Sequence, residues 1–384
     1  MKVVMPCDNL STNGYTRAYP FAKLMSEDYD VTVIGPVEEQ GIFKPLRNDT
    51  SIKYKLYPYK KVFPFYFQNA RNIYKDLNAD IIHSFKVTFP SFLPALIKKI
   101  KNKNQKLILD IDDWESQYMI DNFLSANPIN LAKFTFADLY VPESYFIKKA
   151  LEKQTKKADA IITSSKTLQK MFGGTWIPTG PNTDYFNPEN FSGNKIREEL
   201  DLKGKTVILF SGTPKKHKGI LELMEAINEI NNEDIHLIIV GADKNNPITK
   251  KLKSNKLITV LDQVDNKELP NYMKASDIFC APQWNSKSAN AQLPIKIFEP
   301  MSMQLPVITT NISDMQEIFQ KCGTVIEPNN TEQLKKAILN YVENKELRTK
   351  HGIQARKECL EKYSWKIMKQ KTKEIYESLA PVTT

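Results

Sequence analysis

Short apolar runs alternate with amphipathic segments along most of the chain. Each run has the length and the nearly continuous hydrophobicity of a strand that is buried on both faces of a parallel sheet. The runs lie at residues 2–7, 30–36, 51–58, 79–85, 106–109, 158–163, 206–211, 236–241, 257–264 and 305–310. The segments between many of them carry apolar residues at helical spacing, so the pattern predicts repeated strand–helix–strand units. The expected fold class is therefore α/β, with parallel, doubly wound sheets.

A stretch rich in proline, glycine and asparagine interrupts this pattern near the middle of the chain. It reads WIPTGPNTDYFNP and covers residues 176–188. Such a composition favours an irregular connection between domains, and 384 residues are too many for one ordinary core. We expect domains at 1–180 and 181–363, followed by an amphipathic helix at 364–384. Sites at the strand ends of two such domains would hold a ligand in the cleft between them.

Residues 290–310, NAQLPIKIFEPMSMQLPVITT, predict a loop, a helix, a turn and a buried strand. Pro294 suits a first helical turn, and Lys296 and Glu299 lie near the start of the helix. Free N–H groups at a helix start, with a lysine beside them, attract phosphate. The carboxylate of Glu299 could accept hydrogen bonds from ribose hydroxyls. The alternative is an ordinary amphipathic helix in front of a core strand.

A second candidate phosphate site follows the strand at 206–211. Gly212 and Gly219 enclose a basic loop whose last side chain is Lys218. A loop of this kind at a helix start binds anions through its N–H groups and its lysine. The P-loop pattern is absent, because no Gly-Lys-Ser/Thr follows.

The first half of the chain offers several polar candidates at strand ends. Asp110, Asp112 and Asp113 crowd the end of one strand, and ionised carboxylates there are costly without a partner or a use. Asp112 and Asp113 are therefore candidates for a functional role; the alternative is a turn with an N-cap. A strand-end histidine, His83, either lines the cleft or is structural. The pair Asn13-Gly14 is either a plain turn or a ligand-binding loop.

Three segments resemble glycosyltransferases of family 4, the retaining GT-B enzymes also called glycosyl transferases group 1. They are PIKIFEPMSMQLPVITT (294–310), GTPKKHKG (212–219) and IPTGPNTDYFNP (177–188), and the likeness spans nearly the whole chain. The resemblance implies a GT-B fold: two Rossmann-like domains facing a central cleft, with the C-terminal helix packed back on the first domain. It also implies a nucleotide-sugar donor, retention of the anomeric configuration and no metal or other cofactor.

The resemblance also implies roles for single residues. Lys218 would neutralise the departing diphosphate, and Glu299 would bind the ribose. Asp112 or Asp113, which align with a His-Asp pair near the reacting sugar of related enzymes, would contact the sugar or the acceptor or act as general base. The remaining donor-side candidates are Gly14, Gly212, Thr213, Val264, Pro294 and Lys296, and the acceptor-side candidates are Asn13, His83 and Trp114. Two departures stand out, because Thr213 occupies the place of a usual arginine and Ala291 that of a second glutamate. UDP, GDP and ADP cannot be distinguished as the donor's nucleotide.

Composition narrows the list of partners. The hydrophobic share of 41% and the charged share of 26% are those of a globular protein, and no run approaches a membrane span. The net charge of +10 comes mostly from scattered lysines and is accompanied by no nucleic-acid-binding motif. The four separated cysteines fit neither a metal site nor a disulfide framework, and Met1 leads directly into a core strand. We therefore expect a cytoplasmic protein that binds no nucleic acid.

Two segments could meet a membrane surface. Residues 53–75 interleave aromatic and basic residues, and residues 92–106 run from an apolar start into a basic end. Peripheral attachment to the inner face of the membrane is one interpretation, and core aromatics with a solvated helix end are the other.

The expected function is transfer of a sugar to a glycan, a lipid-linked acceptor or a small molecule. Three alternatives remain open. They are an epimerase or phosphorylase of the same fold, a non-catalytic relative that binds a nucleotide sugar or a partner subunit, and a basic RNA-binding protein.

Overall fold

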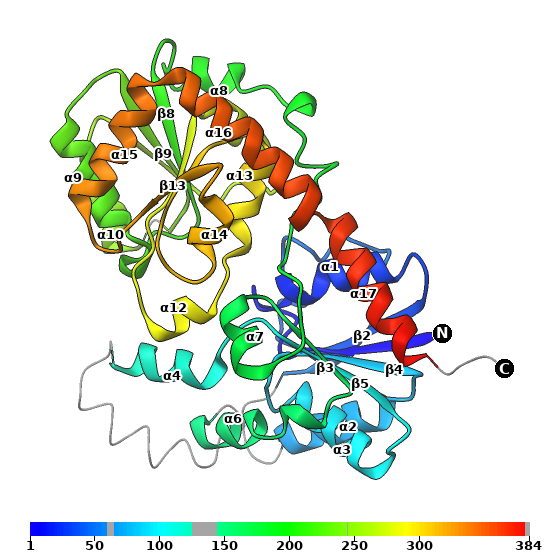
Figure 1. The fold of residues 1–384 in the computed structure, drawn as a ribbon. Helices are drawn as coiled ribbons and strands as arrows, with labels where there is room; N and C mark the ends of the chain where they lie inside the picture. The colour runs from blue at the N-terminus through cyan, green and yellow to red at the C-terminus, as the bar shows by residue number, and fades with distance from the viewer. Residues whose placement is uncertain (60–64, 125–143, 244, 381–384) are drawn as a thin grey trace. The chain divides into compact units, whose positions relative to one another are not determined.

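The computed structural model describes residues 1–59, 65–124, 144–243 and 245–380. The chain forms two compact units, which are drawn in Figure 1. The first contains residues 1–179, 291–293 and 365–384, and the second contains residues 180–290 and 294–364. Each unit is an α/β body with one parallel sheet, which confirms the predicted fold class.

The sheet of the first unit has seven parallel strands in the order β3-β2-β1-β4-β5-β6-β7. The strands are β1 (Lys2–Pro6), β2 (Asp30–Val37), β3 (Lys53–Pro58), β4 (Ile81–Phe85), β5 (Lys106–Ile111), β6 (Ala160–Thr163) and β7 (Thr175–Trp176). The helices are α1 (Tyr15–Met25), α2 (Phe65–Asp76), α3 (Phe92–Lys101), α4 (Glu115–Leu124), α6 (Tyr145–Glu152), η2 (Thr155–Lys157), α7 (Lys166–Phe172) and α17 (Trp365–Leu379).

Both faces of this sheet are covered. Val3 and Met5 of β1 pack in a cluster with residues of α1 and α17. Val4 between them packs in a second cluster, with residues of α2, α3, α6 and α7. Successive side chains of a strand point to opposite faces. Cover on both faces is therefore the reason why β1 is apolar from Val3 onward.

The sheet of the second unit has six strands in the order β10-β9-β8-β11-β12-β13. They are β8 (Thr206–Ser211), β9 (Ile235–Ala242), β10 (Ile258–Asp262), β11 (Ile278–Ala281), β12 (Val307–Thr310) and β13 (Gly323–Ile326). The α-helices are α8 (Asn194–Glu199), α9 (Ile220–Ile230), α10 (Pro247–Leu252), α11 (Leu269–Ala275), α12 (Lys287–Ala291), α13 (Phe298–Ser302), α14 (Met315–Phe319), α15 (Thr331–Glu343) and α16 (Lys345–Glu358). The other helical turns are η3 (Pro188–Asn190), η4 (Lys216–Lys218), η5 (Ile295–Ile297) and the π-helical η6 (Cys359–Tyr363).

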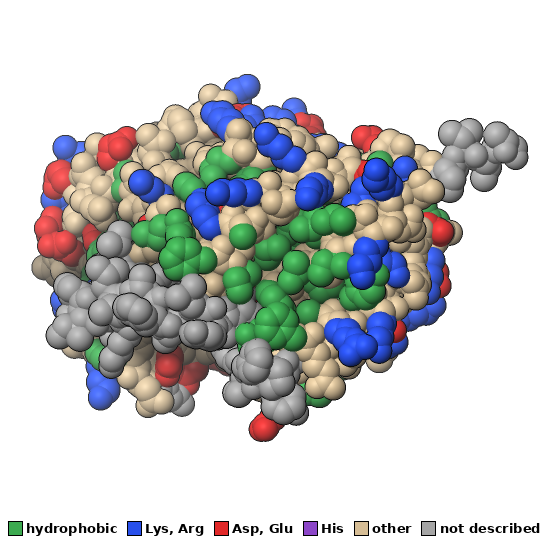
Figure 2. All heavy atoms as spheres, turned by 90° about the horizontal axis from the view of Figure 1, so that it is seen from below, with side chains coloured by type: hydrophobic (Ala, Val, Ile, Leu, Met, Phe, Trp, Pro, Cys, Tyr) green, Lys and Arg blue, Asp and Glu red, His purple; other side chains and the backbone are tan. Residues whose placement is uncertain are grey.

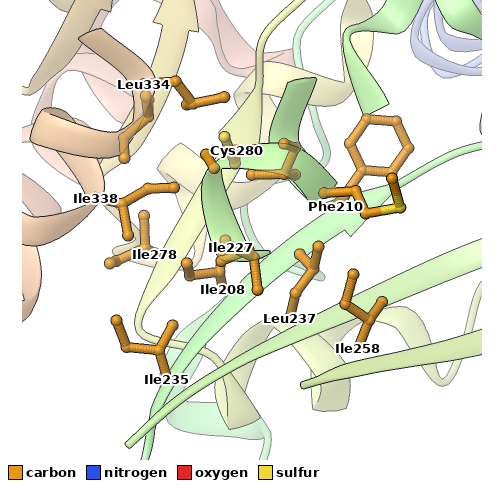
Figure 3. Close-up of a cluster of buried hydrophobic side chains, with 14 of the residues drawn as sticks. Ile208, Phe210, Ile227, Ile235, Leu237, Ile258, Ile278, Cys280, Leu334 and Ile338 are labelled. Carbon is orange, nitrogen blue, oxygen red and sulfur yellow. The ribbon is translucent and has the colours of Figure 1, made fainter. Parts of the chain in front are cut away.

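The core of the second unit lies between its sheet and the helices α9 and α15. Figure 3 shows strand residues such as Ile208 and Leu237 packed with Ile227 of α9 and Ile338 of α15. All four of these side chains are fully or almost fully buried. The core thus fixes β8, and with it the loop that leaves the carboxyl end of this strand.

The helix predicted to begin at Pro294 differs from expectation. Pro294 is extended, Lys296 lies in the 3-10 turn η5, and α13 follows only at Phe298. Pro300 has no N–H to donate to the carbonyl of Lys296, and its ring would collide with that carbonyl in a continuous α-helix. A tighter turn therefore precedes the helix.

Candidate functional site

In both sheets the strand order reverses beside the first strand of the unit. In the first unit the reversal lies between β1 and β4, and in the second it lies between β8 and β11. Parallel α/β sheets bind ligands beyond the carboxyl ends of the strands at such a point. The loops that leave β1, β4 and β5, and those that leave β8 and β11, therefore carry the candidate site residues.

Two lysines of the second unit converge on Gly212, directly after β8. Lys218 Nζ lies 3.4 Å and Lys296 Nζ 3.5 Å from the point where a Cβ on Gly212 would stand. Gly212 has a φ of +133°, which favours glycine. Burial, together with the charges of Lys296 and Lys215, lowers the pKa of Lys218 to about 8. Two like charges around a gap left by a missing side chain form a place for an anion.

Glu299 lies three residues after Lys296 in the sequence, in the first turn of α13. Its Oε2 atom is buried and has no hydrogen-bond partner within the described part of the chain. Burial raises the pKa of this carboxyl to about 7, although Lys296 acts to lower it. An acceptor atom kept dry and unsatisfied costs stability, and a hydroxyl donor from a ligand would remove that cost.

The loop that carries Lys218 is held by the segment after β11. Gly219 has a φ of +69°, and a Cβ here would lie 1.8 Å from the carbonyl oxygen of Pro282. The backbone N–H of Trp284 donates to the carbonyl of His217 (2.8 Å), and the indole N–H donates to Glu222 Oε1 (2.8 Å). Sequence reasoning missed Trp284, whose position relative to β8 is visible only in the folded unit.

The structure also places the other donor-side candidates of the second unit, and Ala291. Thr213 is exposed directly after Gly212, and Pro294 opens the turn that carries Lys296. Ala291 is fully buried and belongs to the first unit. Val264 follows β10, an edge strand that β9 separates from β8.

Lys86 is the centre of the polar cluster in the first unit. Its Nζ lies 2.6 Å from Asp113, 3.0 Å from Glu115 and 3.4 Å from Asp112. Burial acts to lower the pKa of Lys86, but the three carboxylates hold it well above its usual value. Lys148 provides a second cation, 2.8 Å from Glu115. Sequence reasoning found Asp112 and Asp113 but missed Lys86, which has a φ of +70° and gives no sequence signal of its own.

Asp112 and Asp113 do not have equivalent surroundings. Burial raises the pKa of Asp112 to about 7, against the attraction of Lys86. Asp113 is somewhat more exposed and forms the shortest contact to Lys86. A carboxyl with a pKa near 7 can exchange a proton at neutral pH.

Asp110 and His83 lie in the core, not on a site surface. Strand β5 extends through Asp110, whose carboxylate binds the guanidinium of Arg17 through two hydrogen bonds of 2.8 and 2.9 Å. His83 is completely buried, bonds to the hydroxyl of Tyr376 (2.8 Å) and has its pKa lowered to about 3, mainly by burial. The contacts of His83 therefore support a structural role rather than a position lining the cleft.

The remaining first-unit candidates lie near the cluster around Lys86 or directly follow it in sequence. Gly14 has an ordinary helical φ of −58°, and a Cβ here would lie 3.6 Å from Lys86 Cε. Asn13 is exposed. Trp114 Nε1 is buried without a hydrogen-bond partner among the described residues, and Lys149 Nζ lies 5.6 Å from the Trp114 ring.

Two features are absent from the described residues. No three His, Cys, Asp or Glu side chains there are arranged to hold a metal ion. No helix there is long and apolar enough to cross a membrane.

Comparison with known proteins connects this geometry to a family. Residues 192–358 match the family described as glycosyl transferases group 1. An uncharacterized glycosyltransferase of Methanocaldococcus jannaschii is 24% identical over 95% of this chain and 94% of its own. Spore coat protein SA of Bacillus subtilis is 27% identical over 48% of this chain, and the match spans 52% of that protein, about half of its length.

The structural comparison extends over both units. The structure of Alr3699/HepE of Anabaena in complex with UDP-glucose superposes with a TM-score of 0.73 at 16% identity, covering 98% of this chain and 100% of that one. The chain therefore has the GT-B fold, and its residues 192–358 match the family model of the glycosyl transferases group 1.

Proposed function

We propose that this protein transfers a sugar from a nucleoside-diphosphate sugar to an acceptor, with retention of the anomeric configuration and without a metal ion. The observation that carries the proposal is the convergence of Lys218 and Lys296 on Gly212, near Glu299, whose buried Oε2 has no hydrogen-bond partner among the described residues. Two cations match a diphosphate, and a free acceptor oxygen matches a hydroxyl donor such as ribose.

The lysines would act on the leaving group. Negative charge grows on the diphosphate as the bond to the sugar breaks, and cations held in place beforehand stabilise that charge. Loss of one such contact costs about 3 kcal/mol, or roughly a hundredfold in rate. We expect Lys218→Ala and Glu299→Ala to abolish or strongly slow turnover while the fold is kept.

On the acceptor side, Asp112 is the carboxyl best suited to move a proton at neutral pH, because its pKa is raised to about 7. Asp112→Asn should then lower turnover without weakening nucleotide binding. The acceptor classes remain a glycan, a lipid-linked saccharide and a small molecule.

The first experiment is a thermal-shift screen against UDP, GDP, ADP and their sugars, with EDTA present and with Mg²⁺ added. Binding to the native state at a hundred times Kd stabilises it by about 2.7 kcal/mol. UDP-glucose comes first in the screen, because HepE of Anabaena was solved with it. We expect one nucleotide to raise the melting temperature with EDTA present, and Glu299→Ala to remove this shift.

A matched control is Glu343→Ala, since Glu343 is an exposed carboxylate on α15. This variant should respond to nucleotide like the wild type. Wild-type turnover by both Lys218→Ala and Glu299→Ala would refute the site. Retention is checked from the anomeric configuration of the isolated product by NMR.

A second candidate is a non-catalytic relative that binds a nucleotide sugar or a partner subunit. Ala291 favours it, because a buried methyl group stands where the more widespread family motif has a carboxylate. Nucleotide binding without consumption of the bound donor, for any acceptor class, would support this candidate over transfer.

A further inference from the structure

Helix α3 carries a second apolar stripe, on the side that does not face its sheet. Phe92, Ala95 and Leu96 are buried in the core. Ile97 and Ile100 remain 36% and 53% exposed, and Leu93 one turn earlier is half-buried. Residues at i, i+4 and i+7 lie on one helix face. Leu93 still packs against the core cluster of this helix, whereas Ile97 and Ile100 keep a large part of their apolar surface exposed.

Neighbouring helices extend this surface. Helices α2, α3 and α6 contribute to one hydrophobic cluster on the same face of the sheet, and each bears a large exposed apolar side chain. Phe67 on α2 is 48% exposed and Phe146 on α6 is 50% exposed. Figure 1 labels these helices. Figure 2, which views the molecule of Figure 1 from below, shows a continuous hydrophobic area bordered by lysine and arginine side chains. Contiguous patches of this kind mark interaction sites.

The basic residues around this surface are only partly neutralised. Lys99 pairs with Asp159 and Lys149 with Glu152. Arg71, Lys75, Lys101 and Lys103 make no ion pair with any carboxylate of the described ranges. Lys98 and Lys101 extend over the ring of Tyr74, with Nζ 5.2 and 5.3 Å from its centre. Their ammonium groups therefore extend toward α2.

We propose that the outer face of α2, α3 and α6 docks on an anionic phospholipid bilayer. Ile97 and Ile100 would enter the boundary between headgroups and acyl chains, and the unpaired cations would meet the lipid phosphates. A nucleic acid would neutralise the same cations but would leave the isoleucines in water. The proposal uses no residue of the glycosyl-transfer site and does not depend on that reaction.

The test is co-sedimentation of the full chain with lipid vesicles at low salt. Phosphatidylcholine vesicles are compared with vesicles that also contain phosphatidylglycerol. We expect binding to the anionic vesicles, weakened by added salt. The double variant Lys101→Glu/Lys103→Glu should bind at least 25-fold more weakly, because each basic residue near an anionic surface contributes about fivefold. Ile100→Asp should weaken binding about tenfold through lost apolar burial.

Matched controls come from α16 of the second unit. Ile353 is 56% exposed, and Lys345 and Lys350 are exposed as well. Ile353→Asp and Lys345→Glu/Lys350→Glu repeat the same chemical changes in the other unit and should leave vesicle binding unchanged. Circular dichroism and melting curves show whether each variant is folded.

Equal weakening of vesicle binding by the α3 and α16 variants would show that no particular surface is responsible, and would overturn the proposal. Failure of the wild type to sediment with anionic vesicles at low salt would also overturn it, as would equal binding to vesicles of phosphatidylcholine alone.

Discussion

Replacing Lys218 with methionine should stabilise the unliganded protein at neutral pH. The ammonium group is largely buried beside Lys296, and this environment lowers its pKa from 10.5 to about 8. A lowered lysine pKa means that the folded state disfavours the charged form. Methionine keeps an apolar stem of similar length and removes the charge, so the variant should be free of this cost.

The size and the pH range of the effect follow from the pKa. A shift of about 2.5 units corresponds to about 3 kcal/mol, which we reduce to roughly 1–3 kcal/mol because part of the side chain meets solvent. Below pH 8 the lysine is protonated in both the folded and the unfolded state, so the full cost is present. Between pH 8 and 10.5 the folded state releases its proton first, and the cost disappears as pH rises.

The assay is thermal or urea-induced unfolding of the wild type and Lys218→Met at pH 7 and pH 10. We expect a gain at pH 7, with about 2–4 °C in melting temperature per kcal/mol, and a smaller gain at pH 10. Lys216→Met is the control, because Lys216 is exposed in the same loop. No gain at pH 7, a gain independent of pH, or an equal gain in the control would refute the reasoning.

Three further predictions concern charge and backbone at other positions. Glu299→Gln should stabilise the protein by up to about 3 kcal/mol at pH 8 but hardly at pH 4. Burial raises the pKa of Glu299 from 4.5 to about 7, and the cost of burial exists only while the carboxylate is ionised. Melting curves at both pH values test this prediction, and a gain independent of pH would contradict it. Arg17→Met should destabilise the protein by about 3–5 kcal/mol in urea unfolding, because it leaves Asp110 buried without its partner. A loss below about 1 kcal/mol would show that the ion pair is dispensable. Gly219→Ala should lower the free energy of unfolding by at least about 2 kcal/mol, because Gly219 has a positive φ and lies against the Pro282 carbonyl. Gly204→Ala is the control: Gly204 has a φ of +81° but open space around it, so the loss should be only about 1 kcal/mol. Equal losses in the two variants would refute the steric argument.

The sequence alone determined the α/β class and named most residues of the candidate donor-side site. Apolar runs of strand length, separated by helical segments, predict two parallel sheets, because only cover on both faces permits such runs. The glycines around Lys218, and Lys296 with Glu299, stand out because anion binding needs cations and free N–H groups within a few residues of each other. These signals are local in sequence and can be read without a structure.

The partners of buried charges became visible only in the tertiary structure. Arg17 and Asp110 are 93 residues apart in sequence, and nothing near either one indicates the other. Lys86 binds carboxylates that follow the neighbouring strand. His83, which by its place at a strand end could either line the cleft or be structural, lies in the core. Parallel strands bring distant segments together through crossover connections, so the surroundings of a strand-end residue depend on strand order and helix packing.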